Sequence, residues 1–167
     1  MKRFAALVIP LALASCAPML SADPVTLNNP DVQFAQAATG SNLFEIQSSQ
    51  LALTNSSSAP LKTFAQMLIT DHQNAQTQLA SLATAQHLPL PTVLPPDKQL
   101  KVIALGTLNG AAFDAAYIRE QTLAHQLALS VLQNELSAGM NADLKGYATA
   151  QVPVITMHLT TVTALTP

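Results

Sequence analysis

Four long segments with a helical period, separated by short runs of helix-breaking residues, dominate this sequence of 167 residues. Apolar residues recur every three or four positions within each segment, and no run alternates as a half-buried β-strand does. One such helix cannot bury its apolar face alone, whereas four helices joined by short connections can enclose a common core. The sequence therefore predicts an all-α fold, an up-down-up-down four-helix bundle. The predicted helices cover residues 31–55, 61–87, 97–136 and 142–165.

The helix-breaking residues between the segments define the expected ends of these helices. A Ser-Ser-Ser-Ala-Pro run at 56–60 ends the first helix, and the proline-rich stretch 88–96 separates the second from the third. Asp97 is the expected N-cap of the third helix, which should end near Gly139. Pro153 should kink or split the fourth helix, because proline lacks the backbone N–H that a helix interior needs.

The first residues resemble an export signal. A basic start at Lys2 and Arg3 precedes an apolar run over 4–14, which is too short to span a bilayer. The run leads into residues 13–16 (Leu-Ala-Ser-Cys), which resemble the lipobox of bacterial lipoproteins, where the cysteine becomes the lipidated N-terminus. Cys16 is the only cysteine of the chain, so an internal disulfide is excluded.

This signal divides the chain into three parts. We expect residues 1–15 to be a lipoprotein signal peptide, 16–30 the lipidated cysteine with a flexible tether, and 31–167 the bundle domain. By resemblance to Gram-negative lipoproteins, alanine at position 17 favours an outer-membrane lipoprotein that faces the periplasm. The alternative is a soluble periplasmic protein, because residues 12–14 (Ala-Leu-Ala) also fit ordinary signal cleavage.

The charge balance and the lack of familiar motifs exclude several function classes. A net charge of −2 and a pI near 6.0 exclude a basic nucleic-acid-binding surface. Loss of the signal removes two of the seven basic residues, which leaves five against nine acidic residues and a net charge of −4. No nucleophile–base pair, phosphate loop or dinucleotide fingerprint is present, so hydrolases, kinases and dehydrogenases have no motif support.

Several ionisable residues fall on the apolar faces of the predicted helices. His72 lies mid-stripe on the second helix, and Asp114 and His125 share one face of the third. Counting residues from the connections places Glu45 and His158 in the middle of the bundle with them. The stripe of the third segment is expected to run through Leu100, Ile103, Thr107, Gly110, Asp114, Ile118, Gln121, His125, Ala128 and Leu132.

Buried ionisable groups destabilise a fold unless they are paired or bind a metal ion. We therefore expect either a metal site or a satisfied hydrogen-bond network. The ferritin-like di-iron pattern needs two Glu-x-x-His pairs, and the sequence has none, so a single Zn²⁺, Mn²⁺ or Fe²⁺ ion fits better. The candidate ligands are Glu45, His72, Asp114, His125 and His158, and the candidate residues supporting them are Asp71, Tyr117 and Glu120.

Three other residues have structural interpretations. His87, close to a proline, is expected at the surface or as a helix cap. Gly106 and Gly110 permit a close approach of a neighbouring helix or a local bend within the third segment.

Motifs along the chain resemble those of the bacterial domain-of-unknown-function 4142 family. The resemblance spans roughly residues 31–165 and implies a ferritin-like four-helix bundle, exported to the periplasm or the outer membrane and often carrying a lipoprotein signal. It implies no established activity. The motifs are Phe44-Glu45-Ile46 with Leu51-Ala52, Phe64-Ala65-Gln66-Met67 leading to Asp71-His72, Gly110 with Phe113-Asp114 and Tyr117, Gln121 with His125, and Pro153 with His158-Leu159.

The sequence thus favours a non-catalytic lipoprotein of the cell envelope, whose bundle carries a His/carboxylate core site able to bind a metal ion. Its expected contact is the membrane, through the N-terminal lipid, and no nucleic acid is expected. Two alternatives stay open. One is a structural or interaction bundle with a buried hydrogen-bond network, and the other is a metal-dependent redox protein of the ferritin-like kind, which needs an open coordination position.

Overall fold

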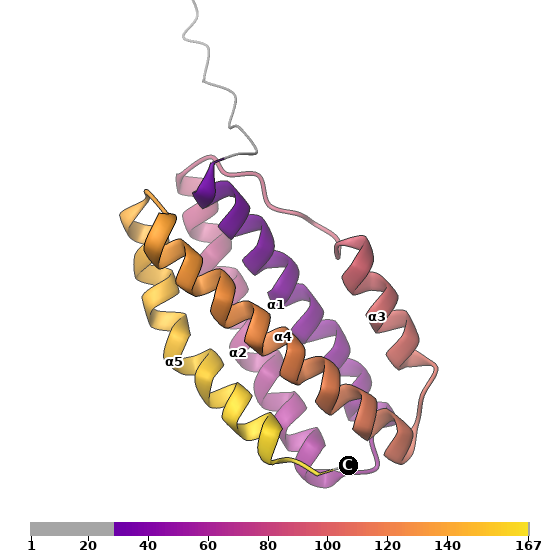
Figure 1. The fold of residues 1–167 in the computed structure, drawn as a ribbon. Helices are drawn as coiled ribbons and strands as arrows, with labels where there is room; N and C mark the ends of the chain where they lie inside the picture. The colour runs from indigo at the N-terminus through magenta and orange to yellow at the C-terminus, as the bar shows by residue number, and fades with distance from the viewer. Residues whose placement is uncertain (1–28, 167) are drawn as a thin grey trace, which may run out of the picture.

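The computed structural model describes residues 29–166, which form five α-helices and no strand (Figure 1). The predicted signal peptide, Cys16 and most of the predicted tether lie outside the described residues. No helix within 29–166 combines the length and the apolar character needed to cross a membrane. The helices are α1 (Pro30–Asn55), α2 (Ala59–Ala85), α3 (Pro96–Gly106), α4 (Gly110–Ala138) and α5 (Ala142–Ala164).

Polar caps and prolines explain where the long helices begin. The side chain of Asn29 accepts a hydrogen bond from the backbone of Asp31 at 2.9 Å, and Ser58 caps α2 through Leu61 N at 3.4 Å. Asn141 caps α5 in the same way, and prolines occupy the first turns of α1 and α2, where no N–H is needed. The predicted bounds of these three helices are confirmed to within two residues at most ends.

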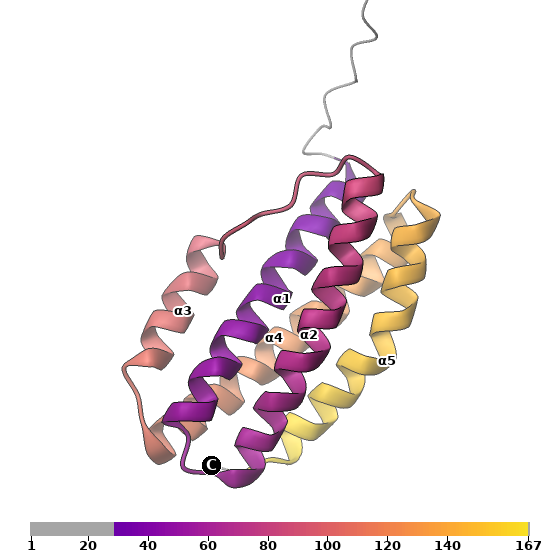
Figure 2. The same ribbon diagram turned by 180° about the vertical axis from the view of Figure 1, so that it is seen from behind.

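The four long helices run side by side and form a helical bundle (Figures 1 and 2). Helix α1 packs against α2 and α4, and α5 packs against α4 and α2. Helix α3 lies outside this group, along the outer side of α1. The all-α prediction is confirmed, and the fold is a helical bundle.

The prediction of one continuous third helix is wrong. The chain leaves the helix at 107–109, and α4 starts at Gly110 with a φ of 57°, a backbone conformation that glycine adopts without strain. The helical phase does not carry across this break, so Leu100 and Ile103 are 67% and 55% exposed instead of facing the core. The expected N-cap is also wrong, because Pro95 occupies that position and Asp97 lies in the first turn of α3.

Helix α5 continues through Pro153 without interruption, so the predicted split does not occur. Pro153 is exposed, which leaves the carbonyl that has lost its helical partner near solvent.

The core consists of two large apolar clusters with a layer of buried polar side chains, the polar layer, between them, and a third, small apolar cluster of Phe44, Leu94 and Ala124. One cluster contains Phe34, Leu79, Leu132 and Ile155, and lies toward the α4–α5 connection. The other contains Leu61, Leu68, Phe113 and Val162, and lies toward the α1–α2 connection. On each long helix the polar layer falls between these clusters, so the apolar packing on both sides holds the polar side chains in place.

Candidate metal centre

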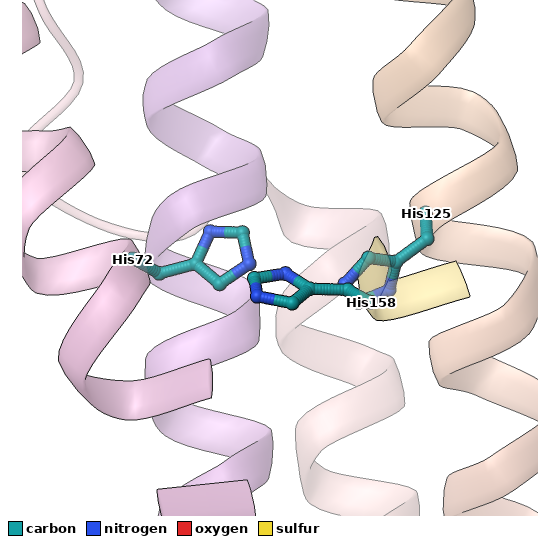
Figure 3. Close-up of side chains that lie close together, drawn as sticks. All are labelled: His72, His125 and His158. Carbon is teal, nitrogen blue, oxygen red and sulfur yellow. The ribbon is translucent and has the colours of Figure 1, made fainter. Parts of the chain in front are cut away.

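Three histidines from three helices meet in the polar layer, and we call His72, His125 and His158 the histidine triad (Figure 3). They come from α2, α4 and α5, and each is at most 2% exposed. One ligand atom from each lies within 4.8 Å of the other two. Nitrogens bound to one ion at about 2.0–2.1 Å lie about 3.4 Å apart, so the ligand atoms need to approach one another by at most about 1.4 Å to share an ion.

Each ring of the triad has one nitrogen that is hydrogen-bonded to an acceptor. Nδ1 of His72 donates to Oδ1 of Asn42 at 3.0 Å, and Nδ1 of His125 donates to the backbone carbonyl of Gln121 at 2.8 Å. Nε2 of His158 donates to Oδ2 of Asp71 at 2.9 Å. The partner atom in each pair is an oxygen that can only accept, so the proton of each neutral ring is on the hydrogen-bonded nitrogen named above.

The second nitrogen of each ring therefore carries a lone pair. These atoms, Nε2 of His72, Nε2 of His125 and Nδ1 of His158, are buried and have no hydrogen-bond partner among the described residues. Metal-binding histidines show this arrangement, in which the outer N–H is held by an oxygen acceptor and the inner nitrogen points at the ion.

Burial keeps the triad uncharged. Removal from water lowers the pKa of His125 to about 4 and lowers that of His72 well below its usual value. The pKa of His158 is also lowered by burial, against the pull of the Asp71 carboxylate. Imidazole must be neutral to bind a metal, so the triad is in its binding-competent protonation state at neutral pH.

Aromatic rings close the triad on one side. The ring of Phe64 lies 6.5 Å from the rings of both His125 and His158, and the three imidazoles lie 5.4–5.9 Å from one another. This packing excludes water from that side and fixes the ring orientations.

Glu45 belongs to the polar layer but lies on the outer side of His125. Its Oε1 is 3.8 Å from Nδ1 of His125, the nitrogen that already donates to Gln121. Burial raises the pKa of Glu45 to about 8, although Lys98 and Gln121 pull it down. The carboxyl is therefore mostly protonated at pH 7, and its contact with His125 is to the nitrogen that already carries a proton.

Of the other predicted site residues, Asp114, Tyr117 and Glu120 pair with residues outside the triad, whereas Asp71 contacts it. Asp114 accepts a hydrogen bond from Ser57 at 2.9 Å, near the α1–α2 connection. The Tyr117 hydroxyl pairs with Ser49 at 2.7 Å, and Glu120 forms an ion pair with Lys101 at 3.0 Å. Asp71 is in contact with His158 and half-exposed, as a supporting residue would be. His87 is exposed at the end of α2.

Asn42 was missed by sequence reasoning, although it holds His72. It also donates to Gln76 at 3.1 Å, so its orientation is fixed from two sides. Its position three residues before Glu45, on the same inward face of α1, was the available signal.

A second buried polar group lies at the end of the bundle, and we call Asp31 and Glu135 the acid pair. Asp31 is 6% exposed and accepts hydrogen bonds from the backbone N–H groups of Met140 and Asn141 at 2.7 and 3.2 Å. Glu135 is fully buried, and burial together with Asp31 raises its pKa to about 7, with Lys145 acting in the opposite direction. A proton on Glu135 lets it donate to Asp31, which joins the start of α1 to the end of α4.

Comparisons with known proteins show the family of this chain and the proteins that share its fold. The model of the family described as "Domain of unknown function (DUF4142)" matches residues 16–165. No curated protein sequence matches the chain. A DUF305 fragment from Deinococcus radiodurans has a similar structure, with a TM-score of 0.71 at 16% identity, covering 80% of this chain and 92% of that one.

Two further solved structures share the fold. A DUF305 protein from Streptomyces coelicolor has a TM-score of 0.69 at 14% identity and covers 82% of this chain and 91% of its own. CopM in the Cu(I)-bound form has a TM-score of 0.66 at 18% identity and covers 80% of this chain and 92% of its own. At such identities these likenesses show the fold alone.

Proposed function

We propose that this chain, which belongs to the DUF4142 family, binds one metal ion through the histidine triad. The observation that carries the proposal is the pattern of nitrogens: all three outer N–H groups are held by oxygen acceptors, and all three inner nitrogens are buried lone pairs without a donor. Leaving such atoms unpaired costs free energy, and a cation offsets that cost.

A hydrogen-bond network alone is a weaker explanation of the same geometry. Such a network would supply a proton donor to each inner nitrogen, and within residues 29–166 no side chain or backbone N–H does so. A neutral imidazole has one donor and one acceptor, so the triad cannot satisfy itself once its three protons point outward.

The donor set favours ions that accept nitrogen ligands. Imidazole suits zinc, copper, iron and nickel, whereas manganese prefers oxygen donors. The structural likeness to Cu(I)-bound CopM adds copper to the ions expected from the sequence. We therefore propose zinc or copper as the bound ion, in a non-catalytic role.

The first residues of the sequence support a proposal for the cellular location of this site. We propose an outer-membrane lipoprotein anchored through Cys16 and facing the periplasm, with the four long helices alternating in direction as in ferritin-like bundles. In cell fractions, Cys16→Ser is expected to move the protein from membranes to the soluble periplasm. A wild-type protein that is already found in the soluble fraction would contradict the proposed lipid anchor at Cys16.

Elemental analysis by mass spectrometry tests the metal site, on protein purified without an affinity tag or chelator. The wild type is expected to hold close to one ion per chain, and His72→Ala and His125→Ala to hold less than about a tenth of that, because two imidazoles bind far more weakly than three. His87→Asn is the matched control, since His87 is exposed and its φ of 56° suits asparagine. A folded wild type without metal, or equal metal content in all variants, contradicts the proposal.

A further inference from the structure

A small cavity lies in the bundle beside the histidine triad. It has about 30 Å³ available to water-sized molecules, between α1, α4 and α5, and His72 of α2 forms part of its wall. A space of about 10–15 Å³ measured in this way holds one water molecule, so the cavity has room for a ligand of two or three heavy atoms.

The position of the cavity follows from residues one helical turn away from the triad. Ala128 lies three residues after His125 in α4, and Ile155 lies three residues before His158 in α5, and both line the cavity. Three residues advance a helix by about 4.5 Å, so the cavity adjoins the triad on the side of the α4–α5 connection. Phe64 covers the triad from another helix and does not line this space.

The cavity wall is mainly apolar and includes a few polar side chains. Asn42, Tyr147 and Gln151 line it together with apolar side chains. Asn42 orients His72 from the side of its N–H group, and His72 is the member of the triad that lines the cavity. Tyr147 is 7% exposed and keeps its proton, because burial raises its pKa.

Three imidazoles leave the coordination of a zinc ion incomplete. Sites with three protein ligands keep a fourth position for water or an external ligand, whereas closed structural sites use four protein ligands. The cluster of candidate ligands found within 29–166 contains the three histidines and no fourth residue.

We infer that this cavity binds a small oxygen or nitrogen Lewis base, such as water, hydroxide or azide, as the fourth ligand of the ion in the triad. The inference rests on the proposed function, because it needs the ion. Tyr147 and Gln151 hydrogen-bond the external ligand, and the open position makes the ion accessible to small molecules while the triad itself stays buried.

Azide binding to the cobalt(II)-substituted protein tests this inference, because the visible absorption of cobalt(II) changes with its ligands. Azide is expected to change the wild-type spectrum, and the change should saturate as more azide is added. Ala128→Leu, which fills the cavity, is expected to hold cobalt and to bind azide at least about tenfold more weakly. Ala115→Leu, at an exposed position of the same helix, is the matched control and should behave as wild type.

A second variant keeps the test independent of packing. Tyr147→Phe removes one hydroxyl and leaves the ring, so azide affinity should fall about fivefold, as expected for one lost hydrogen bond, at unchanged cobalt content. Cobalt bound at one per chain with a spectrum that azide does not change overturns this inference and leaves the proposed function standing. Equal azide affinity in wild type and Ala128→Leu overturns it as well, and a wild type that binds no cobalt, zinc or copper overturns both proposals.

Discussion

The histidine triad and the acid pair are both buried clusters of ionisable groups, and they differ in how their hydrogen-bonding capacity is met. In the acid pair two backbone N–H groups donate to Asp31 and a proton on Glu135 removes one of the two negative charges, so the unmet capacity is confined to the oxygens of one residue, Glu135. In the triad three outer acceptors use up the protons and leave three inner lone pairs unmet. Burial alone therefore does not identify a binding site, whereas unmet capacity shared by several groups does.

The largest expected difference between the two regions is in their response to metal. Zinc or copper at about a hundred times its dissociation constant should raise the free energy of unfolding of the wild type by about 3 kcal/mol over the chelator-treated protein. Glu135→Gln should respond equally, and His125→Ala should not respond. Urea unfolding with and without the ion measures this, and a metal response in His125→Ala would show that the ion acts outside the triad.

The acid pair is expected to make the free energy of unfolding depend on pH. In the folded protein the pKa of Glu135 is about 7, above the usual 4.5, so between these pH values the folded state keeps a proton that the unfolded chain has released. The stabilisation is complete below pH 4.5 and is lost as pH rises through 7. Glu135→Gln keeps a donor to Asp31 at every pH and should lack this loss.

Urea unfolding of wild type and Glu135→Gln at pH 5, 6.5 and 8 compares the two directly. The difference between them matters, because the triad, whose pKa values are lowered, changes stability with pH in the opposite direction. If the free energy of unfolding changes with pH in the same way in both proteins, no shared proton stabilises the acid pair.

A smaller effect should come from the outer acceptor of His158. Asp71→Asn keeps an oxygen that accepts from Nε2 but loses the negative charge, so metal affinity should fall about tenfold with little change in the stability of the metal-free protein. Asp97→Asn, on the exposed face of α3, is the matched control. Competition with a chromophoric chelator measures both affinities, and equal values would mean that the Asp71 charge does not support the ion.

The positions of the three histidines could be predicted because long helices are regular. Phase identified the inward faces, and counting from the connections placed His72, His125 and His158 in the middle of the bundle, together with Glu45 and Asp114. Asp114 shows the limit of that count: it shares a face with His125 but lies about three turns away, and it pairs with Ser57 instead. The acceptors Asn42 and the Gln121 carbonyl depend on side-chain rotamers and ring orientations, which a one-dimensional pattern does not contain.

The break between α3 and α4 was missed for a related reason. Leu100, Ile103 and Thr107 continue the stripe of α4 in phase, so the period favoured one helix. The Asn109-Gly110 pair was the contrary signal, since such a pair commonly marks a turn. Gly110 was expected to permit a local bend, and the structure places the start of a new helix there.

Helix α3 has a consequence for the dynamics of the molecule. Leu105 is its one buried side chain, and a helix of 11 residues is marginal when little packs against it. Its amide protons should therefore exchange with solvent through local opening, at a much lower free energy than those of α1, α2, α4 and α5, which share the core. The bundle then behaves as a rigid four-helix unit with a segment on its side that unfolds and refolds many times before the whole domain unfolds once.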